Sequence, residues 1–119
     1  MRDKPGDLQR LLHIRDAINE AQNFVGNVSF DEFINNTMMC YACTKLIENV
    51  GEAAKHISLE VKSQFPAISW KRITGMRHIL VHEYFGVDFE VLWNVMQTEL
   101  PILKPQIQQI IDNLSPPSV

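Results

Sequence analysis

The side chains that could do chemistry are concentrated in one short segment, residues 75–86. It holds Arg77, His78, His82 and Tyr84 beside aliphatic residues. An arginine offers a fixed fork of donors to a phosphate, a histidine can give or take a proton near neutral pH, and a tyrosine adds a hydroxyl. Arginine and histidine together suffice for metal-free cleavage of a phosphodiester by a neighbouring ribose 2′-oxygen. By chemistry alone, a core or capping role for any one of these residues is an equal alternative.

The spacing of Arg77 and His82 sets a geometric condition on such a site. The two residues are five apart, which is about 140° around an ideal α-helix, so one helix face cannot present both side chains. Three arrangements remain open. The helix unwinds before His82, the two groups meet across a dimer, or the Arg77 side chain reaches around the helix.

A metal site is a second hypothesis for the same histidines. His78 and His82 are four residues apart, as are Glu52 and His56, so on helices each pair would share a face. Carboxylate-bridged sites in helical bundles instead place glutamate and histidine three residues apart and add carboxylates from other helices. The spacing is therefore wrong for that class, and we expect neither a metal nor another cofactor.

Cys40 and Cys43 have CxxC spacing, which occurs in redox and zinc sites. In a redox fold this motif begins a helix after a strand, whereas here it lies in the middle of a predicted helix, and the sequence has no second cysteine pair for zinc. We expect both residues to be buried as small hydrophobic side chains, in a chain kept reduced in the cytoplasm.

The composition is that of an ordinary globular protein, with 119 residues, 45% of them apolar and 21% charged. We expect a single domain over residues 1–119. No apolar run approaches the ~18 residues that span a bilayer. The N-terminus is charged and lacks the apolar region of a secretion signal, so neither a membrane nor an export route is expected.

The net charge of −3 gives no reason to expect nucleic-acid binding. The distribution of charge is more informative, because residues 61–82 contain no acidic residue but four basic ones: Lys62, Lys71, Arg72 and Arg77. This segment is either a local basic patch or the solvated face of a helix.

Apolar residues recur at helical spacing through nearly the whole chain, and no alternating strand pattern is present. Glycine, serine, asparagine and proline residues mark where the helices start and stop. The predicted helices are one capped by Asp7 and ending at Gly26, a long one from Ser29 to about His56, a short one from Ser58 to about Phe65, one over 70–81 capped by Ser69, and one over 89–114 capped by Asp88 and kinked or split at Pro101 and Pro105. The residues expected to face the core are Leu11, Ile14, Ile18, Ala21 and Val25 in the first helix and Phe33, Ile34, Met38, Tyr41, Ala42, Leu46 and Val50 in the second. An all-α, up-and-down bundle of about four to five helices follows.

Arg77, His82 and Tyr84 form an R-x4-H-x-Y pattern, which resembles the signature of the HEPN superfamily and, within it, of the HepT-like ribonuclease toxins. Further blocks resemble that family in the same order along the chain: IENVGEAAK at 47–55, FPAISW at 65–70, GMR at 75–77, LVHEYFGVD at 80–88, VLW at 91–93 and LP at 100–101. One position departs from the pattern. His78 stands where asparagine or aspartate is common, and it would orient the catalytic histidine, touch RNA or add a proton donor.

The resemblance implies a HEPN-like bundle that forms a homodimer, with the two motifs lining one cleft. The implied activity is that of an endoribonuclease that needs no metal. His82 would act as general base or acid, Arg77 would hold the phosphate, and Tyr84 would complete the site.

The resemblance also implies a partner, a minimal nucleotidyltransferase of the MNT type that acts as antitoxin. In that pairing the antitoxin can transfer AMP to the motif tyrosine, here Tyr84, and silence the toxin. The alternative is a non-catalytic helical protein that docks on and regulates a nucleotidyltransferase, because some HEPN domains only bind or scaffold.

Overall fold

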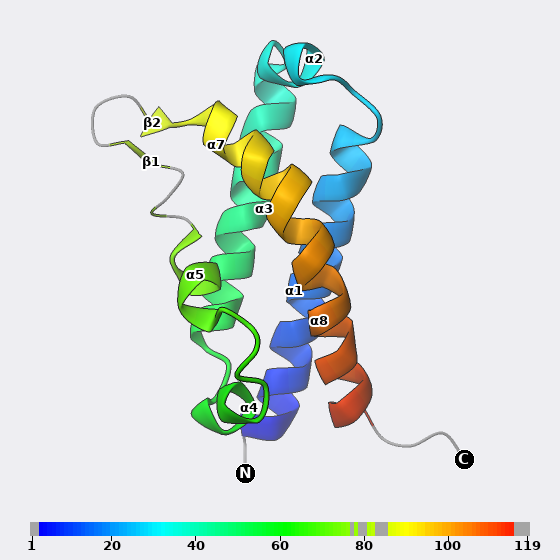
Figure 1. The fold of residues 1–119 in the computed structure, drawn as a ribbon, viewed down its shortest axis with the longest axis vertical. Coiled ribbons are helices and arrows are strands. Elements are labelled where there is room, and N and C mark those ends of the chain that lie inside the picture. Colours follow the sequence, from blue (N-terminus) through cyan, green and yellow to red (C-terminus); the bar gives the residue numbers. More distant parts are fainter. Residues whose placement is uncertain (1–2, 77, 79–80, 83–85, 116–119) are drawn as a thin grey trace.

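The structure is a computed structural model that describes residues 3–76, 78, 81–82 and 86–115 (Figure 1). Two long helices, α1 and α3, lie side by side along the long axis, and a chain of helical segments, α7, η1 and α8, crosses in front of them. The predicted all-α bundle is confirmed. The elements in chain order are α1 (Asp3–Val25), α2 (Phe30–Ile34), α3 (Thr37–Lys55), α4 (Leu59–Gln64), α5 (Trp70–Thr74), β1 (Val81–His82), β2 (Gly86–Val87), α7 (Phe89–Asn94), the π-helical segment η1 (Val95–Glu99) and α8 (Leu100–Leu114).

The first helix has the predicted core face, but its N-terminal signal was assigned wrongly. The five residues predicted to face the core are all buried. Asp7, predicted to cap α1, lies inside that helix, which already begins at Asp3. Its buried carboxylate instead accepts hydrogen bonds from the backbone N–H and the hydroxyl of Ser58, at 2.8 and 2.6 Å. Asp7 therefore ties the start of α1 to the N-cap of α4.

The predicted second helix is two helices. Ser29 and Glu32 form the expected capping box at the start of α2. That helix ends at Ile34, and Asn36 caps α3 by accepting a hydrogen bond from the backbone N–H of Met39 at 3.0 Å.

The buried face of α3 differs from the predicted one. Met38 and Tyr41, predicted to face the core, are 83% and 58% exposed, and Cys40, Cys43 and Ile47 are buried instead. Cys40 and Ile47 follow Phe33 at seven-residue intervals, so the buried stripe keeps the helical spacing of Phe33 although α2 and α3 are separate helices. The predicted core face was therefore wrong at the N-terminal end of α3 and right again at Val50.

The last helix is interrupted just before Pro101, as predicted, whereas Pro105 lies inside α8, which continues to Leu114. Asp88 caps α7 by accepting hydrogen bonds from the backbone N–H groups of Glu90 and Val91. Just before Pro101 the backbone widens into η1, where the N–H of Leu100 donates to the carbonyl of Val95. Pro101 has no N–H to continue the α-helical ladder, which explains why the irregular turn falls here. None of the helices in the described part of the chain is long and apolar enough to cross a bilayer.

Candidate active site

The predicted helix over 70–81 is confirmed at its start and wrong at its end, because Val81 is extended. Helix α5 ends at Thr74, with Gly75 as its C-cap, and Ser69 stands at the N-cap position without a side-chain hydrogen bond. Val81 and His82 are extended and pair antiparallel with Val87 and Gly86. Strands of two residues are too short to show an alternating sequence pattern, which is why the sequence did not reveal them.

The change of backbone conformation removes one geometric obstacle. Met76 and His78 are helical, whereas Val81 and His82 are extended. Of the three arrangements left open for Arg77 and His82, the structure supports the first, in which the helix ends before His82. The 140° separation on an ideal helix therefore does not apply to this pair.

The structure describes the surroundings of the predicted catalytic residues rather than their side chains. Arg77 and Tyr84 lie outside the described residues. For His82 the backbone is described, and it pairs with Gly86 in the hairpin. His78 is exposed, and its backbone N–H donates to the carbonyl of Gly75 at 3.0 Å.

Both flanks of the motif segment are held by the bundle. Before it, Met76 is 2% exposed and belongs to the hydrophobic core. After it, Val87 packs against the core and Asp88 caps α7. Between them the chain turns with Gly86 at φ +76°, a left-handed conformation that glycine adopts without steric cost. The described residues on both sides of the motif are therefore fixed by the bundle.

Helix α5, which leads into the motif, packs very closely against α3. A Cβ atom at Gly51 would lie 3.2 Å from the carbonyl oxygen of Ile73, so a glycine allows this approach. Beside the contact is a hollow of about 390 Å³. Its lining residues are Gly51, Glu52, Lys55, Lys71, Thr74, Gly75 and His78. We call it the α3–α5 hollow. The basic residues in it belong to different elements, so sequence spacing alone did not bring them together.

Glu52 and His56, weighed above as half of a metal site, bind each other. The Glu52 carboxylate and the His56 Nε2 are 3.1 Å apart, and both side chains are about half exposed. Among the described residues there is no group of three or more histidine, cysteine, aspartate or glutamate side chains placed to hold a metal ion.

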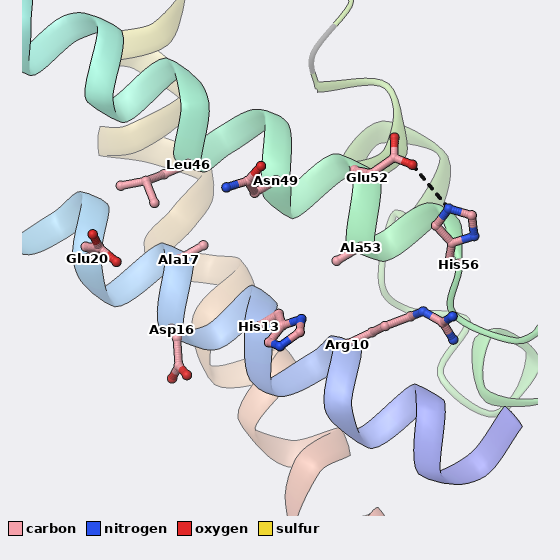
Figure 2. A pocket seen from close by; sticks show the side chains of 10 residues that line it. All are labelled: Arg10, His13, Asp16, Ala17, Glu20, Leu46, Asn49, Glu52, Ala53 and His56. Atoms are coloured by element: carbon pink, nitrogen blue, oxygen red, sulfur yellow. Dashed lines mark hydrogen bonds and ion pairs between the residues drawn. The ribbon is translucent and has the colours of Figure 1, made fainter. Parts of the chain in front are cut away.

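A second hollow, of about 470 Å³, lies between α1 and α3 (Figure 2). Arg10 and His13 project toward it from α1, and Glu52 and His56 border it from α3. The sequence analysis did not identify Arg10 or His13. Their three-residue spacing on one helix face was the available signal, but such spacing is common on solvated helices. Asp16 and Glu20 line the same hollow, so its charge is mixed.

The cysteines have the structural role that was predicted. Cys40 and Cys43 are free thiols and fully buried. The Cys40 thiol donates to the carbonyl of Phe33 at 3.1 Å. Burial raises the pKa of Cys40, and burial together with the neighbouring Cys40 raises the pKa of Cys43 to about 11. Neither thiol ionises near neutral pH, so these cysteines are not nucleophiles.

Comparison with known proteins identifies the family. Residues 14–110 match the family described as "Ribonuclease HepT-like". MJ1380 of Methanocaldococcus jannaschii, whose name describes it as a candidate RNase, is 35% identical over 98 residues, which cover 82% of this chain and 90% of that protein. The "Probable ribonuclease HepT" of Thermococcus cleftensis is 33% identical over 97 residues, covering 82% and 88% of the two chains. No solved structure matches the chain significantly.

The match covers most of the chain and places it in a class of ribonucleases. The chain belongs to the HepT-like ribonuclease family. The family resemblance noted from the sequence is confirmed, and so is the predicted enzyme class, an endoribonuclease, at the level of the family.

Proposed function

We propose that the chain is a metal-independent endoribonuclease toxin of a toxin–antitoxin pair, and that Arg77, His82 and Tyr84 form its active site. The observation that carries the proposal is the change from helical to extended backbone between His78 and Val81. It removes His82 from the helix on which it could not share a face with Arg77. Membership of the HepT-like ribonuclease family supports the same assignment.

In this mechanism His82 removes the proton from a ribose 2′-hydroxyl, and the 2′-oxygen attacks the adjacent phosphorus. The Arg77 guanidinium binds the phosphate oxygens and offsets the charge that develops on them. The bond to the 5′-oxygen breaks as a general acid, the protonated His82 of the second chain in the dimer proposed below, gives that oxygen a proton, which leaves a 2′,3′-cyclic phosphate and a 5′-hydroxyl. No water or metal ion takes part in this step.

The test is cleavage of a labelled RNA in the presence of EDTA. We expect the wild type to cut the RNA and leave the end groups given above. His82→Ala should cut about 10²–10⁴-fold more slowly, which is the range for the loss of a general acid or base. Arg77→Lys should fail as well, since lysine keeps the charge but loses the bidentate fork. Cleavage by His82→Ala at the wild-type rate would contradict the assignment. If the wild-type protein does not cut RNA yet binds a nucleotidyltransferase, the chain is instead a non-catalytic regulatory partner.

We further propose a homodimer that acts in the cytoplasm as a single domain over residues 1–119. Each chain supplies one His82, whereas acid–base cleavage requires a base and an acid on opposite sides of the phosphate. Two-fold pairing would bring two copies of the motif into one cleft. Light scattering should give twice the monomer mass at micromolar concentration, and a stable monomer would contradict the composite site.

The proposed partner is an MNT-type nucleotidyltransferase that silences the site. The Tyr84 hydroxyl would attack the α-phosphate of ATP, pyrophosphate would leave, and AMP would remain attached through a phosphodiester. That group adds about one negative charge near Arg77 and fills the cleft, so it would exclude RNA both electrostatically and sterically. After co-expression with the partner, the intact mass should rise by one or more AMP units, and Tyr84→Phe should abolish the rise. Neutralisation without modification would show that the partner inhibits by docking alone.

A further inference from the structure

The α3–α5 hollow is lined by basic side chains from three parts of the chain. Lys55 comes from the end of α3, Lys71 from α5, and His78 from the start of the motif segment. All three are exposed. Neither lysine makes an ion pair with any residue in the described part of the chain.

The other basic residues of the acid-free segment 61–82 that the structure describes are already engaged. Arg72 donates two hydrogen bonds of 2.6 Å to the Glu99 carboxylate, which links α5 to η1 and raises the pKa of Arg72. Lys62 lies over the ring of Trp70, at 5.9 Å from its centre. The basic residues of this segment therefore fall into two groups. Lys62 and Arg72 make contacts within the fold, and Lys71 lines the α3–α5 hollow.

The hollow is also positive rather than neutral. Its only carboxylate among the described lining residues belongs to Glu52, which is bound to His56. Two lysines against this one carboxylate leave the described lining with a net positive charge. Its volume of about 390 Å³ falls in the range of small-molecule sites, roughly 300–1,000 Å³.

We propose that Lys55 and Lys71 form a phosphate-binding subsite that holds the RNA strand beside the scissile phosphate. His78 lines the hollow and directly follows Arg77 in the chain, so the subsite adjoins the predicted catalytic residues. Lysine is a flexible point charge, suited to gripping backbone phosphates without reading the bases. The subsite would raise affinity for single-stranded RNA independently of sequence. This inference rests on the proposed function for its ligand.

The test is the binding of a short fluorescent single-stranded RNA by the full chain across a salt series. The background is His82→Ala, so that RNA is not consumed. The double variant Lys55→Gln/Lys71→Gln is compared with Lys45→Gln/Lys104→Gln, which removes the same two charges from exposed positions outside the hollow. Thermal melting of both variants shows that each is folded.

We expect the Lys55/Lys71 variant to raise the Kd about tenfold, and to reduce the slope of log K against log salt by about 1.4, the value for two phosphate contacts in a single strand. The control variant should keep the wild-type slope. If both variants weakened RNA binding equally, the subsite would be overturned, because the effect would then come from net charge alone.

Cleavage by the active protein separates this inference from the proposed function. With His82 present, the Lys55/Lys71 variant should raise KM and leave kcat nearly unchanged, as expected for residues that bind ground and transition states equally. If the wild type cuts RNA and the lysine variant keeps its KM, the subsite is wrong and the ribonuclease assignment stands. If RNA binds through these lysines but is not cut, the ribonuclease assignment is wrong and the subsite stands. Absence of RNA binding by the wild type would overturn both.

Discussion

The α1–α3 pair and the motif segment after α5 are constructed by different physical means. The long helices are joined by apolar side chains at helical spacing, such as Ile14, Ile18 and Ile47, all fully buried. The motif segment has a two-residue strand pair, a glycine at positive φ and one core anchor on each side. Much of the buried apolar surface thus lies in the helix pair, and the proposed chemistry lies in the segment between Met76 and Val87. A substitution in one region should affect mainly the property located there.

The largest loss of stability is expected from a substitution in the core of the helix pair. Ile47→Ala should lower the free energy of unfolding by about 2–5 kcal/mol, because it removes buried methyl groups and leaves a cavity. Met38→Ala, on the exposed side of the same helix, should change it by less than about 0.5 kcal/mol. Urea unfolding of both variants measures the difference. If Met38→Ala costs as much as Ile47→Ala, the buried face of α3 is the one that the sequence first indicated.

A smaller loss is expected where α1 is tied to α4. Asp7→Ala would leave the backbone N–H and hydroxyl of Ser58 without their partner and should cost about 1–3 kcal/mol. Combining it with Ser58→Ala in a double-mutant cycle isolates the interaction between the two side chains. Additive effects would contradict the coupling. RNA cleavage by the folded Asp7→Ala protein should be unchanged, since this contact lies away from the motif.

The next substitution is expected to reverse the pattern, with more effect on activity than on stability. Gly86 has φ +76°, so Gly86→Ala should add about 1–2 kcal/mol of backbone strain at the hairpin. No described atom would lie within 4 Å of the new Cβ, so the strain is conformational rather than steric crowding. Gly86→Asn is the matched variant, because asparagine tolerates this conformation better than alanine. We expect cleavage to fall in the order glycine, asparagine, alanine while the melting temperature changes little. A large loss of melting temperature with normal cleavage would show that the hairpin supports the fold instead.

The smallest effect concerns pH and the capping box of α2. The Ser29 backbone N–H, and next the Ser29 side chain, lower the pKa of Glu32 from 4.5. A lowered pKa in the folded state means that ionised Glu32 stabilises the protein above pH 4.5, and that this contribution disappears as pH falls through the lowered value. Glu32→Gln should remove that part of the acid dependence. Melting curves below pH 4.5 for the two proteins would show it, and parallel curves would contradict it.

The difference between the two regions also explains what the sequence could predict. Helical periodicity identified the buried face of α1, and local signals identified the caps at Ser29, Ser58 and Asp88. The periodicity was misread at Met38 and Tyr41. The buried stripe runs from Phe33 through Cys40 and Ile47 at seven-residue intervals, and apolar residues beside that stripe were assigned to the core.

The candidate site was predictable in part. The motif residues were found from their spacing and from the family resemblance, but the α3–α5 hollow was not. Lys55 and Lys71 are sixteen positions apart in the sequence and meet only because Gly51 lets α5 approach α3. A tertiary contact of this kind leaves no periodic signal. Asp7 shows the same limit, since its partner Ser58 is 51 residues away.

The π-helical turn at Val95–Glu99 determines how α8 is rotated relative to α7. A turn in which Leu100 donates to Val95 accommodates one residue more than an α-helical turn over the same rise. If the same residues formed a regular α-helix, the extra one would turn α8 by about 100° relative to α7, since each residue rotates an α-helix by that angle. Leu103 and Ile107 would then leave the face that packs on α1, and Glu99 would turn away from Arg72. A chain with one residue fewer here could therefore replace the wide turn by an α-helical one and keep the same face of α8 buried.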